Sequence, residues 1–175
     1  SDGSILFVGN STIIRSFDSY ISNNQRKKFD LYSNRGVSGI EGNVSTALGI
    51  ADACSKPVIC VLGDISFMHD LNSVFMWEKC QTQVITIVIN NSSGGIFTLL
   101  PIQKDQEILP YMTTPHETEF KAISSLSKID YMRVDHLDGL IRSLNNALNS
   151  QKHCLIEAIV NKEENIQIYN QLYQF

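Results

Sequence analysis

The sequence predicts an α/β fold, namely a three-layer sandwich with a mostly parallel central sheet. Apolar, strand-like runs alternate along the chain with segments of helical periodicity, a pattern typical of parallel strands joined by right-handed crossovers. Two of the runs, residues 57–62 and 84–89, are rich in β-branched side chains and resemble strands covered on both faces. A chain of 175 residues, 43% of them hydrophobic, can bury such a core without a disulfide or a structural metal.

The strand predictions rest on short apolar runs. In chain order, the predicted strands are residues 4–8, 29–32, 57–62, 84–89 and 154–160. The second is the shortest, and the last follows the longest helical segment. A polar or glycine-bearing stretch follows each of the first four runs, as expected where a parallel strand ends and a crossover begins.

Helical spacing of apolar side chains predicts the connecting helices. These are residues 12–22, 43–53, 71–79, 117–126 and 137–149, with a short terminal helix at 166–175. The stripe in the fifth helix predicts packing against the sheet; it consists of Leu137, Leu140, Ile141, Leu144 and Leu148. Residues 101–115 hold three of the four prolines and are irregular, which fits either a mobile loop over a site or a surface excursion.

Composition bounds the organisation and the partners of the chain. Residues 1–175 are expected to form a single domain, because no linker or internal repeat interrupts them. No apolar run approaches the roughly 20 residues that a membrane span needs. With a net charge of −4 and dispersed Lys and Arg, nothing favours nucleic acid as a partner. The chain opens Ser-Asp-Gly-Ser without a methionine, which fits either a processed protein or a segment of a longer one.

The cysteines indicate a reducing compartment. Cys54, Cys60, Cys80 and Cys154 form no C-x-x-C pair, and Cys60 lies inside an apolar run. We expect buried, reduced thiols and a cytoplasmic location, since disulfides are rare there.

The predicted strand ends concentrate the polar residues and glycines. In parallel α/β sheets, ligands bind beyond the carboxyl ends of the strands. Four clusters fall there, at residues 9–11, 33–42, 63–66 and 90–97. This concentration predicts a ligand site at that edge of the sheet.

Asp64 and Asn91 predict a metal–diphosphate site. They follow two strong predicted strands that one helix connects, so these strands are expected to be neighbours or near neighbours. A carboxylate, an amide oxygen and a backbone carbonyl give Mg²⁺ part of an oxygen shell, which phosphate oxygens and water complete. The alternative is that Asp64 caps a helix and Asn90-Asn91 is a plain turn.

Two arginines are candidates for binding carboxylates, because a guanidinium can grip a carboxylate through two hydrogen bonds. Arg35 lies in a glycine-flanked loop at a strand end, which favours a functional role, whereas Arg15 lies on a predicted helix, where an arginine taken alone is more often a surface charge. No role in the site is predicted for the four histidines, which show no metal-binding spacing: His69, His116, His136 and His153.

Taken together, the clusters resemble one family. Gly63-Asp64 followed by Asn90-Asn91 resembles the diphosphate motif of thiamine-diphosphate enzymes, with Ile65 where that motif commonly has glycine. The fuller strings resemble, in content and order, the C-terminal cofactor domain of the 2-succinyl-5-enolpyruvyl-6-hydroxy-3-cyclohexene-1-carboxylate synthase (MenD) family: Val8-Gly9-Asn10-Ser11, Ser33-Asn34-Arg35-Gly36, Gly63-Asp64-Ile65-Ser66 and Asn90-Asn91 with Ile96-Phe97. The resemblance covers nearly the whole chain and is densest over residues 5–101.

The resemblance implies a thiamine-diphosphate-binding fold, with residues 1–175 as the diphosphate- and Mg²⁺-binding domain and the pyrimidine-binding and middle domains absent. It implies a transferase of menaquinone biosynthesis, a thiamine-diphosphate-dependent carboligase that decarboxylates 2-oxoglutarate and adds the succinyl carbanion to isochorismate. It also implies a homodimer or homotetramer, in which a glutamate of the partner's pyrimidine-binding domain activates the cofactor. This segment alone is therefore expected to be inactive.

The resemblance also implies residue roles. Asp64, Asn91 and the carbonyl of Ser93 would bind Mg²⁺, and the remaining cofactor-binding residues would be Gly63, Ile65, Ser66, Gly94 and the apolar wedge Ile40. The substrate side would be Arg15, Arg35 and Ser11 on carboxylates, with Ile96 and Phe97 lining the pocket. This chain has Asn-Asn-Ser-Ser-Gly-Gly where the family commonly has Asn-Asn-Asn-Gly-Gly, so an altered loop at Ser93 is expected.

Two alternatives stay open at this point. One is the cofactor domain of another thiamine-dependent decarboxylase or of an acetohydroxyacid-synthase-like enzyme, although the paired arginines favour a dicarboxylate substrate. The other is a non-catalytic α/β phosphate-binding module, which no G-x-G-x-x-G or G-x-x-x-x-G-K-[ST] string supports.

Overall fold

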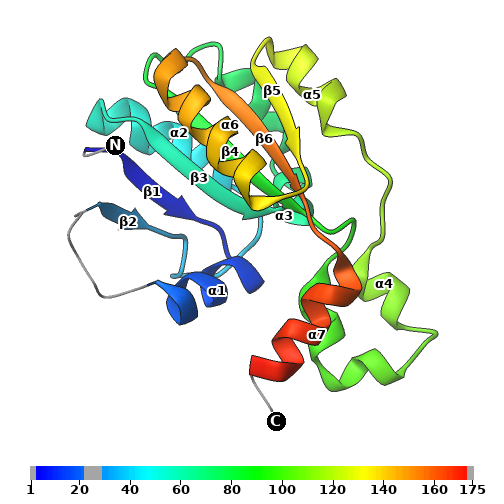
Figure 1. Ribbon diagram of the computed structural model, residues 1–175. Coiled ribbons are helices and arrows are strands. Elements are labelled where there is room, and N and C mark those ends of the chain that lie inside the picture. Colours follow the sequence, from blue (N-terminus) through cyan, green and yellow to red (C-terminus); the bar gives the residue numbers. More distant parts are fainter. Residues whose placement is uncertain (1–2, 22–28, 173–175) are drawn as a thin grey trace.

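A six-stranded, entirely parallel sheet forms the centre of the computed structural model, which describes residues 3–21 and 29–172 (Figure 1). The strands run in the order β2-β1-β3-β4-β6-β5. Their bounds are β1 (Ile5–Val8), β2 (Asp30–Tyr32), β3 (Val58–Gly63), β4 (Val84–Asn90), β5 (Asp130–Val134) and β6 (Cys154–Ile159). The predicted α/β class is confirmed, and every described strand is parallel to its neighbours.

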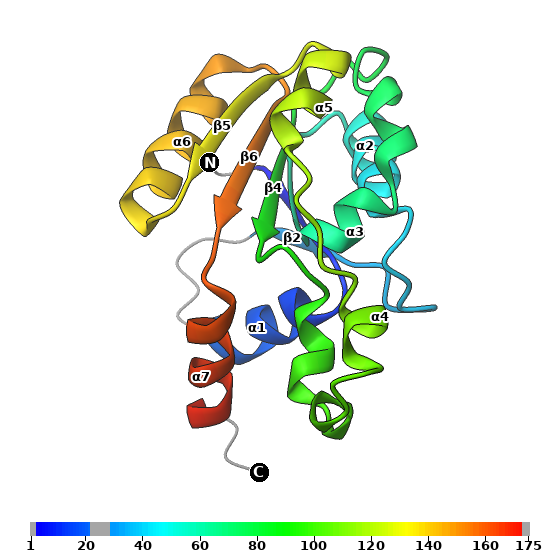
Figure 2. The same ribbon diagram turned by 90° about the vertical axis from the view of Figure 1, so that its right-hand side faces the viewer.

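Helices cover both faces of this sheet, which makes three layers (Figure 2). The helices are α1 (Thr12–Tyr20), α2 (Asn43–Cys54), α3 (Asp64–Met68), α4 (Leu109–Thr113), α5 (Phe120–Ser127), α6 (Leu137–Ser150) and α7 (Lys162–Leu172). Three 3₁₀ helices are η1 (Leu71–Met76), η2 (Gly95–Leu99) and η3 (Pro101–Lys104). Within the described ranges, no helix is long and apolar enough to span a membrane.

Alternating side chains of the strands divide the core into two clusters. Along β3, Cys60 and Leu62 point to the face covered by α2, α3, η1 and α5, whereas Ile59 and Val61 point to the face covered by α1 and α6. Strands buried on both faces must be apolar almost throughout, which explains the continuous runs in the sequence. The apolar stripe predicted for α6 faces the sheet through Leu140, Leu144 and Leu148, but the prediction is wrong for Leu137 and Ile141, which are exposed.

The sheet register places the ligand-binding edge. β3 and β4 are adjacent, with Gly63 opposite Ile89, so the residues that follow these strands emerge side by side. This confirms the prediction that the two strands are neighbours. α1, α4 and α7 lie beyond the arrowheads of the central strands in both views (Figures 1 and 2).

Several element predictions are corrected by the structure. The sequence pattern does not predict β5, because it is an edge strand that pairs only with β6 and carries exposed polar residues such as Asp130 and Arg133. Residues 71–79, predicted as an α-helix, form the 3₁₀ helix η1 over Leu71–Met76. The irregular tract 101–115 contains η3 and α4. The terminal helix begins at Lys162, and its predicted end at 175, like the predicted end of the first helix at 22, lies outside the described residues.

The prediction that all four thiols are buried is wrong for Cys54, which is exposed near the end of α2. The other three are buried. Burial raises the pKa of Cys60, and it raises the pKa of Cys154 to about 12, so both stay protonated thiols at neutral pH.

A close approach at Gly9 fixes the chain where it leaves β1 for the ligand-binding edge. The Gly9 N–H donates to the Val61 carbonyl oxygen at 2.7 Å. A Cβ at Gly9 would lie 2.8 Å from the Leu62 Cβ and 3.2 Å from its Cα, which leaves no space for a side chain. Only glycine lets β1 end this close to β3.

We therefore expect Gly9→Ala to lower the free energy of unfolding by about 1–3 kcal/mol, because the added methyl group forces backbone apart at an overpacked position. Gly49→Ala is the matched control: Gly49 is exposed in α2 with open space where an added methyl group would point, so this change should stabilise by about 0.5–1 kcal/mol. Urea unfolding of both variants measures the difference. Equal effects at the two positions would contradict the close approach.

Candidate functional site

A cavity of about 380 Å³ opens beyond the carboxyl ends of β1, β3 and β4. The loops after these strands line it together with α1, η2 and α7. Most of the predicted site residues border it, namely Ser11, Ile40, Gly63, Asp64, Ile65, Ser66, Asn91, Ser93, Gly94, Ile96 and Phe97. The structure thus brings these residues together at the edge where the sequence predicts a ligand.

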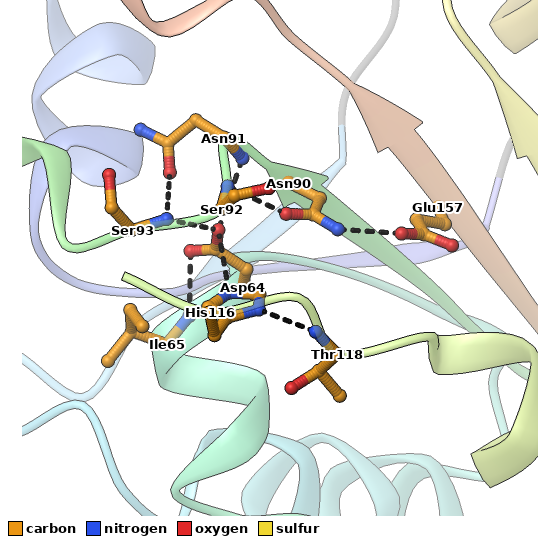
Figure 3. A network of polar contacts seen from close by, with 9 residues as sticks. All are labelled: Asp64, Ile65, Asn90, Asn91, Ser92, Ser93, His116, Thr118 and Glu157. Atoms are coloured by element: carbon orange, nitrogen blue, oxygen red, sulfur yellow. Dashed lines mark hydrogen bonds and ion pairs between the residues drawn. The ribbon is translucent and has the colours of Figure 1, made fainter. Parts of the chain in front are cut away.

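Asp64 is the buried charge at the centre of this edge. It follows β3 as the first residue of α3, and its side chain is 4% exposed. Oδ1 accepts the Ile65 N–H at 2.7 Å, while Oδ2 accepts the N–H groups of Asn91 and Ser93, each at 3.1 Å (Figure 3). Burial raises the pKa of Asp64 above its usual value, and the Ile65 and Ser93 N–H groups together with His116 oppose that rise.

Asn91 and Ser93 converge on the same point. The Ser93 N–H is shared between Asp64 Oδ2 and Asn91 Oδ1, which it reaches at 3.3 Å, so a carboxylate and an amide oxygen lie around one donor. Gly95 makes room for this arrangement, because a Cβ there would lie 2.6 Å from Asn91 Nδ2. The buried Oγ of Ser93 has no hydrogen-bond partner among the described residues.

The unusual backbone conformation of this loop falls on Ser92 rather than Ser93. Ser92 adopts a left-handed conformation with φ of 59°, which a residue with a side chain rarely takes, whereas Ser93 does not. The Ser92 N–H donates to Asn90 Oδ1 at 2.8 Å, and this bond helps to hold the turn. The expected alteration of the loop at Ser93 stays a prediction.

Asn90 is in turn held by a buried acid that the sequence pattern does not single out. Asn90 Nδ2 donates to Glu157 Oε1 at 2.6 Å (Figure 3). The Tyr131 hydroxyl donates to Glu157 Oε2. Glu157 lies on β6 and is 4% exposed. Burial of the Tyr131 hydroxyl, together with its hydrogen bond to the Glu157 carboxylate, raises the pKa of Tyr131. The only signal in the sequence is a single acid within the apolar run of β6.

His116 is a second missed residue. The prediction that it plays no part in the site is wrong in its geometry, since Nε2 lies 3.3 Å from Asp64 Oδ2 and the side chain is only 8% exposed. His116 lies far from Asp64 along the chain, in the stretch between α4 and α5. Metal-like spacing could not reveal it, because it contacts the carboxylate rather than belonging to a cluster of histidines.

Ser66 and Ile40 are linked to each other. The Ser66 hydroxyl donates to the Ile40 carbonyl oxygen at 2.6 Å, and Asn43 Nδ2 donates both to that carbonyl and to Ser66 Oγ, at 2.6 and 2.8 Å. The hydroxyl proton of Ser66 is therefore committed to the backbone of Ile40. These bonds connect the start of α2 to α3 and fix the position of Ile40 on the cavity wall.

The two arginines lie apart from this cavity. Arg15 and Arg35 are exposed and line a neighbouring depression of about 500 Å³, and Phe17 borders both spaces. Arg15 Nη1 donates to the Ser11 carbonyl oxygen at 2.6 Å, and this bond uses only one of the five N–H donors of the guanidinium. The structure thus brings the arginines to one depression, next to the cavity rather than inside it.

Asn10 organises the loop that carries Arg35. It is 2% exposed, and its Nδ2 donates to the carbonyl oxygens of Asn34 and Gly39 at 3.0 and 2.6 Å. Its Oδ1 accepts from Arg35 Nη1 at 2.9 Å. One buried amide therefore ties the end of β1 to both ends of the 34–39 loop and orients Arg35.

The residues at the edge fit Mg²⁺ bound together with a diphosphate. Within the described ranges, no three His, Cys, Asp or Glu residues form a metal cluster. One carboxylate, one amide oxygen and a neighbouring backbone carbonyl instead form a partial shell of hard oxygens, which Mg²⁺ accepts when phosphate and water supply the rest. A cation would also compensate the burial of Asp64, which its N–H donors and His116 only partly offset.

Comparison with known proteins identifies relatives along almost the whole chain. A family model described as "Thiamine pyrophosphate enzyme, C-terminal TPP binding domain" matches residues 8–158. The 2-succinyl-5-enolpyruvyl-6-hydroxy-3-cyclohexene-1-carboxylate synthase of Syntrophus aciditrophicus (strain SB) is 43% identical over 169 residues, covering 96% of this chain. Synthases of the same name from Proteus mirabilis (strain HI4320) and Chlorobium phaeovibrioides (strain DSM 265 / 1930) are 36% and 32% identical, over 95% and 96% of the chain. The chain spans 29% of the length of each of these relatives.

The hydrogen bonds of the Asn10 side chain give a direct test of the loop geometry at the site. We expect Asn10→Ala to lower the free energy of unfolding by about 1–3 kcal/mol, because the buried amide loses its partly buried hydrogen bonds to the Asn34 and Gly39 carbonyl oxygens and to Arg35. Asn145→Ala, at an exposed position of α6, is the control and should change stability by less than about 0.5 kcal/mol. Chemical unfolding of both variants measures these changes. A free energy of unfolding of Asn10→Ala equal to that of the wild-type chain would contradict the role of Asn10 in holding the loop.

Proposed function

This chain belongs to the family of C-terminal TPP-binding domains of thiamine pyrophosphate enzymes, and we propose that it is the Mg²⁺- and thiamine-diphosphate-binding part of a MenD-like synthase. The proposed reaction of the whole protein is decarboxylation of 2-oxoglutarate and transfer of the remaining four-carbon unit to isochorismate, in menaquinone biosynthesis. The names of the relatives and the matching order of site strings support this assignment. The alternatives of a different thiamine enzyme or a plain phosphate-binding module have no comparable support.

We assign the metal to Asp64, Asn91 and the carbonyl of Ser93. The observation that carries this assignment is the shared Ser93 N–H, which brings the carboxylate of Asp64 and the amide oxygen of Asn91 together at adjacent strand ends. The Asp64 carboxylate supplies the one negative charge of the set, and the amide oxygen of Asn91 and the carbonyl oxygen of Ser93 are neutral. The remaining octahedral positions of Mg²⁺ are then available to phosphate oxygens and water.

The diphosphate would lie beside this metal, along the cavity wall formed by Gly63, Ile65, Ser66 and Gly94. The Gly94 N–H donates to the Thr113 carbonyl oxygen at 2.6 Å, so Gly94 would contribute close approach rather than a donor. The hydroxyl of Ser66 is likewise committed to Ile40, so its proposed contribution comes from its backbone.

Ile40 is proposed as the apolar wedge against the cofactor. Its carbonyl oxygen is held by Ser66 and Asn43, so its side chain is presented to the cavity from a fixed backbone. When bound, thiamine diphosphate supplies the electron sink for decarboxylation, and the protein contributes position, charge and a dry surrounding. Ile96 and Phe97 of η2 extend the apolar wall where the reacting carbon would lie.

The substrate carboxylates are assigned to Arg15 and Arg35, with Ser11 beside them. The two guanidinium groups line one depression that shares Phe17 with the cofactor cavity, so an acid bound there would reach toward the cavity. The hydrogen bond from Arg35 to Asn10 holds the guanidinium toward this position. A pair of arginines suits a dicarboxylate better than a monocarboxylate substrate.

The metal assignment predicts that Asp64→Ala weakens Mg²⁺-dependent binding of thiamine diphosphate by more than about 100-fold, beyond what loss of an outer hydrogen-bond partner costs. Calorimetric titration in Mg²⁺ and in EDTA measures this. Asp130→Ala, at the opposite end of the sheet, is the control and should bind like the wild-type chain. Unchanged affinity of Asp64→Ala, or wild-type binding that ignores Mg²⁺, would refute the proposed site.

Turnover should need a group that this cavity does not hold. Among the described residues that line the cavity there is no glutamate, and the resemblance implies that the activating glutamate comes from a pyrimidine-binding domain. We therefore expect no turnover when this chain alone is mixed with 2-oxoglutarate, isochorismate, thiamine diphosphate and Mg²⁺. Loss of isochorismate followed by ultraviolet absorbance checks this, with the full-length synthase of Syntrophus aciditrophicus as positive control. Product formation by the chain alone would contradict this prediction.

A further inference from the structure

The stretch between α4 and α5 lies against the loop that carries the proposed metal ligands. The Gly94 N–H donates to the Thr113 carbonyl oxygen at 2.6 Å, and the His116 N–H donates to the Ser92 carbonyl oxygen at 3.1 Å. Two backbone hydrogen bonds thus connect the 113–116 stretch to the 92–94 loop. Neither bond involves a side chain, so the side chain of His116 is free to serve another contact.

That contact is made by a ring whose orientation is fixed on both sides. The Thr118 N–H donates to His116 Nδ1 at 3.2 Å, so Nδ1 carries no proton and the ring proton lies on Nε2. Nε2 then donates to Asp64 Oδ2 at 3.3 Å (Figure 3). The ring packs against Phe120 with 6.0 Å between centroids, and Phe120 packs edge-on against Phe67 of α3 at 5.2 Å. The imidazole is therefore a rigid donor aimed at a single carboxylate oxygen.

The donors at Asp64 are unequally divided between its two oxygens. Within the described residues, Oδ2 accepts from Asn91, Ser93 and His116, whereas Oδ1 accepts only from Ile65. A carboxylate oxygen offers about two lone pairs. The Asn91 and Ser93 N–H groups already match the lone pairs of Oδ2, and His116 adds a third donor, so the capacity left for a cation is on Oδ1.

We propose that His116 is a positioning residue for the metal-binding carboxylate, an assignment that rests on the proposed function. As the one side-chain donor on Oδ2 among the described residues, its Nε2–H fixes the rotation of the carboxylate and so presents Oδ1 to a cation. Single-oxygen binding suits Mg²⁺, which requires compact octahedral geometry, and disfavours Ca²⁺, which takes more ligands and accepts both oxygens of one carboxylate. The role of His116 is thus to favour the smaller cation as well as to hold the carboxylate.

The test compares His116→Phe with His116→Gln and the wild-type chain. Phenylalanine keeps the aromatic packing on Phe120 but lacks the donor, whereas the glutamine amide can donate again. Calorimetry in saturating thiamine diphosphate gives the dissociation constants of Mg²⁺ and of Ca²⁺ for each protein. His116→Phe should bind Mg²⁺ about 10- to 100-fold more weakly, as is usual when a partner of a metal ligand is lost. Its affinity for Ca²⁺ should change by much less, and His116→Gln should regain most of the preference for Mg²⁺.

The control is His69→Phe, because His69 lies at the end of α3 away from Asp64 Oδ2 and should leave both metal affinities unchanged. Thermal unfolding checks that each variant is folded, and His116→Leu replaces His116→Phe if the latter does not fold. An unchanged Mg²⁺ to Ca²⁺ ratio in the donor-free variant, an equal loss of both metals, or no recovery in His116→Gln would overturn the inference while leaving the proposed function intact. Absence of Mg²⁺-dependent binding in the wild-type chain would overturn both.

Discussion

The compensation of one buried carboxylate, that of Asp64, organises the ligand-binding edge of this protein. A carboxylate removed from water is stable only if it is protonated, paired with a cation or surrounded by donors. Asp64 receives backbone N–H groups from its own helix and from the loop after β4, together with the imidazole of His116. All of these donors are peptide or ring N–H groups, and burial still raises the pKa of Asp64, so the arrangement leaves the carboxylate able to attract a metal.

The parallel sheet explains how these donors meet. Because β3 and β4 are neighbours in register, Asp64 and the 90–93 loop leave the sheet at the same level. β6 lies on the other side of β4 and brings Glu157 to Asn90, which in turn accepts the Ser92 N–H and supports its left-handed turn. The geometry of the 90–93 loop therefore depends on three adjacent strands, β3, β4 and β6, of which β6 precedes none of the proposed ligands.

The fold and the cavity-lining residues could be predicted because their signals are local. Asp64 and Asn91 each follow an apolar run directly, and the carboxyl end of a parallel strand is where ligands bind, so position along the chain was sufficient. β5 could not be predicted, because an edge strand tolerates exposed polar residues and therefore lacks a clear apolar pattern. The contacts of His116 and Glu157 could not be predicted for a different reason. Their importance arises from contacts with residues distant in sequence, and neither stands in a pattern that distinguishes it from an ordinary surface histidine or a strand acid.

The measurement closest to the central claim is a crystal structure of this chain grown with Mg²⁺ and thiamine diphosphate. The account predicts a metal ion about 2.1 Å from Asp64 Oδ1, Asn91 Oδ1 and the Ser93 carbonyl oxygen, with diphosphate oxygens completing its shell and His116 still on Oδ2. A diphosphate bound away from this edge, or a metal that contacts neither Asp64 nor Asn91, would contradict it.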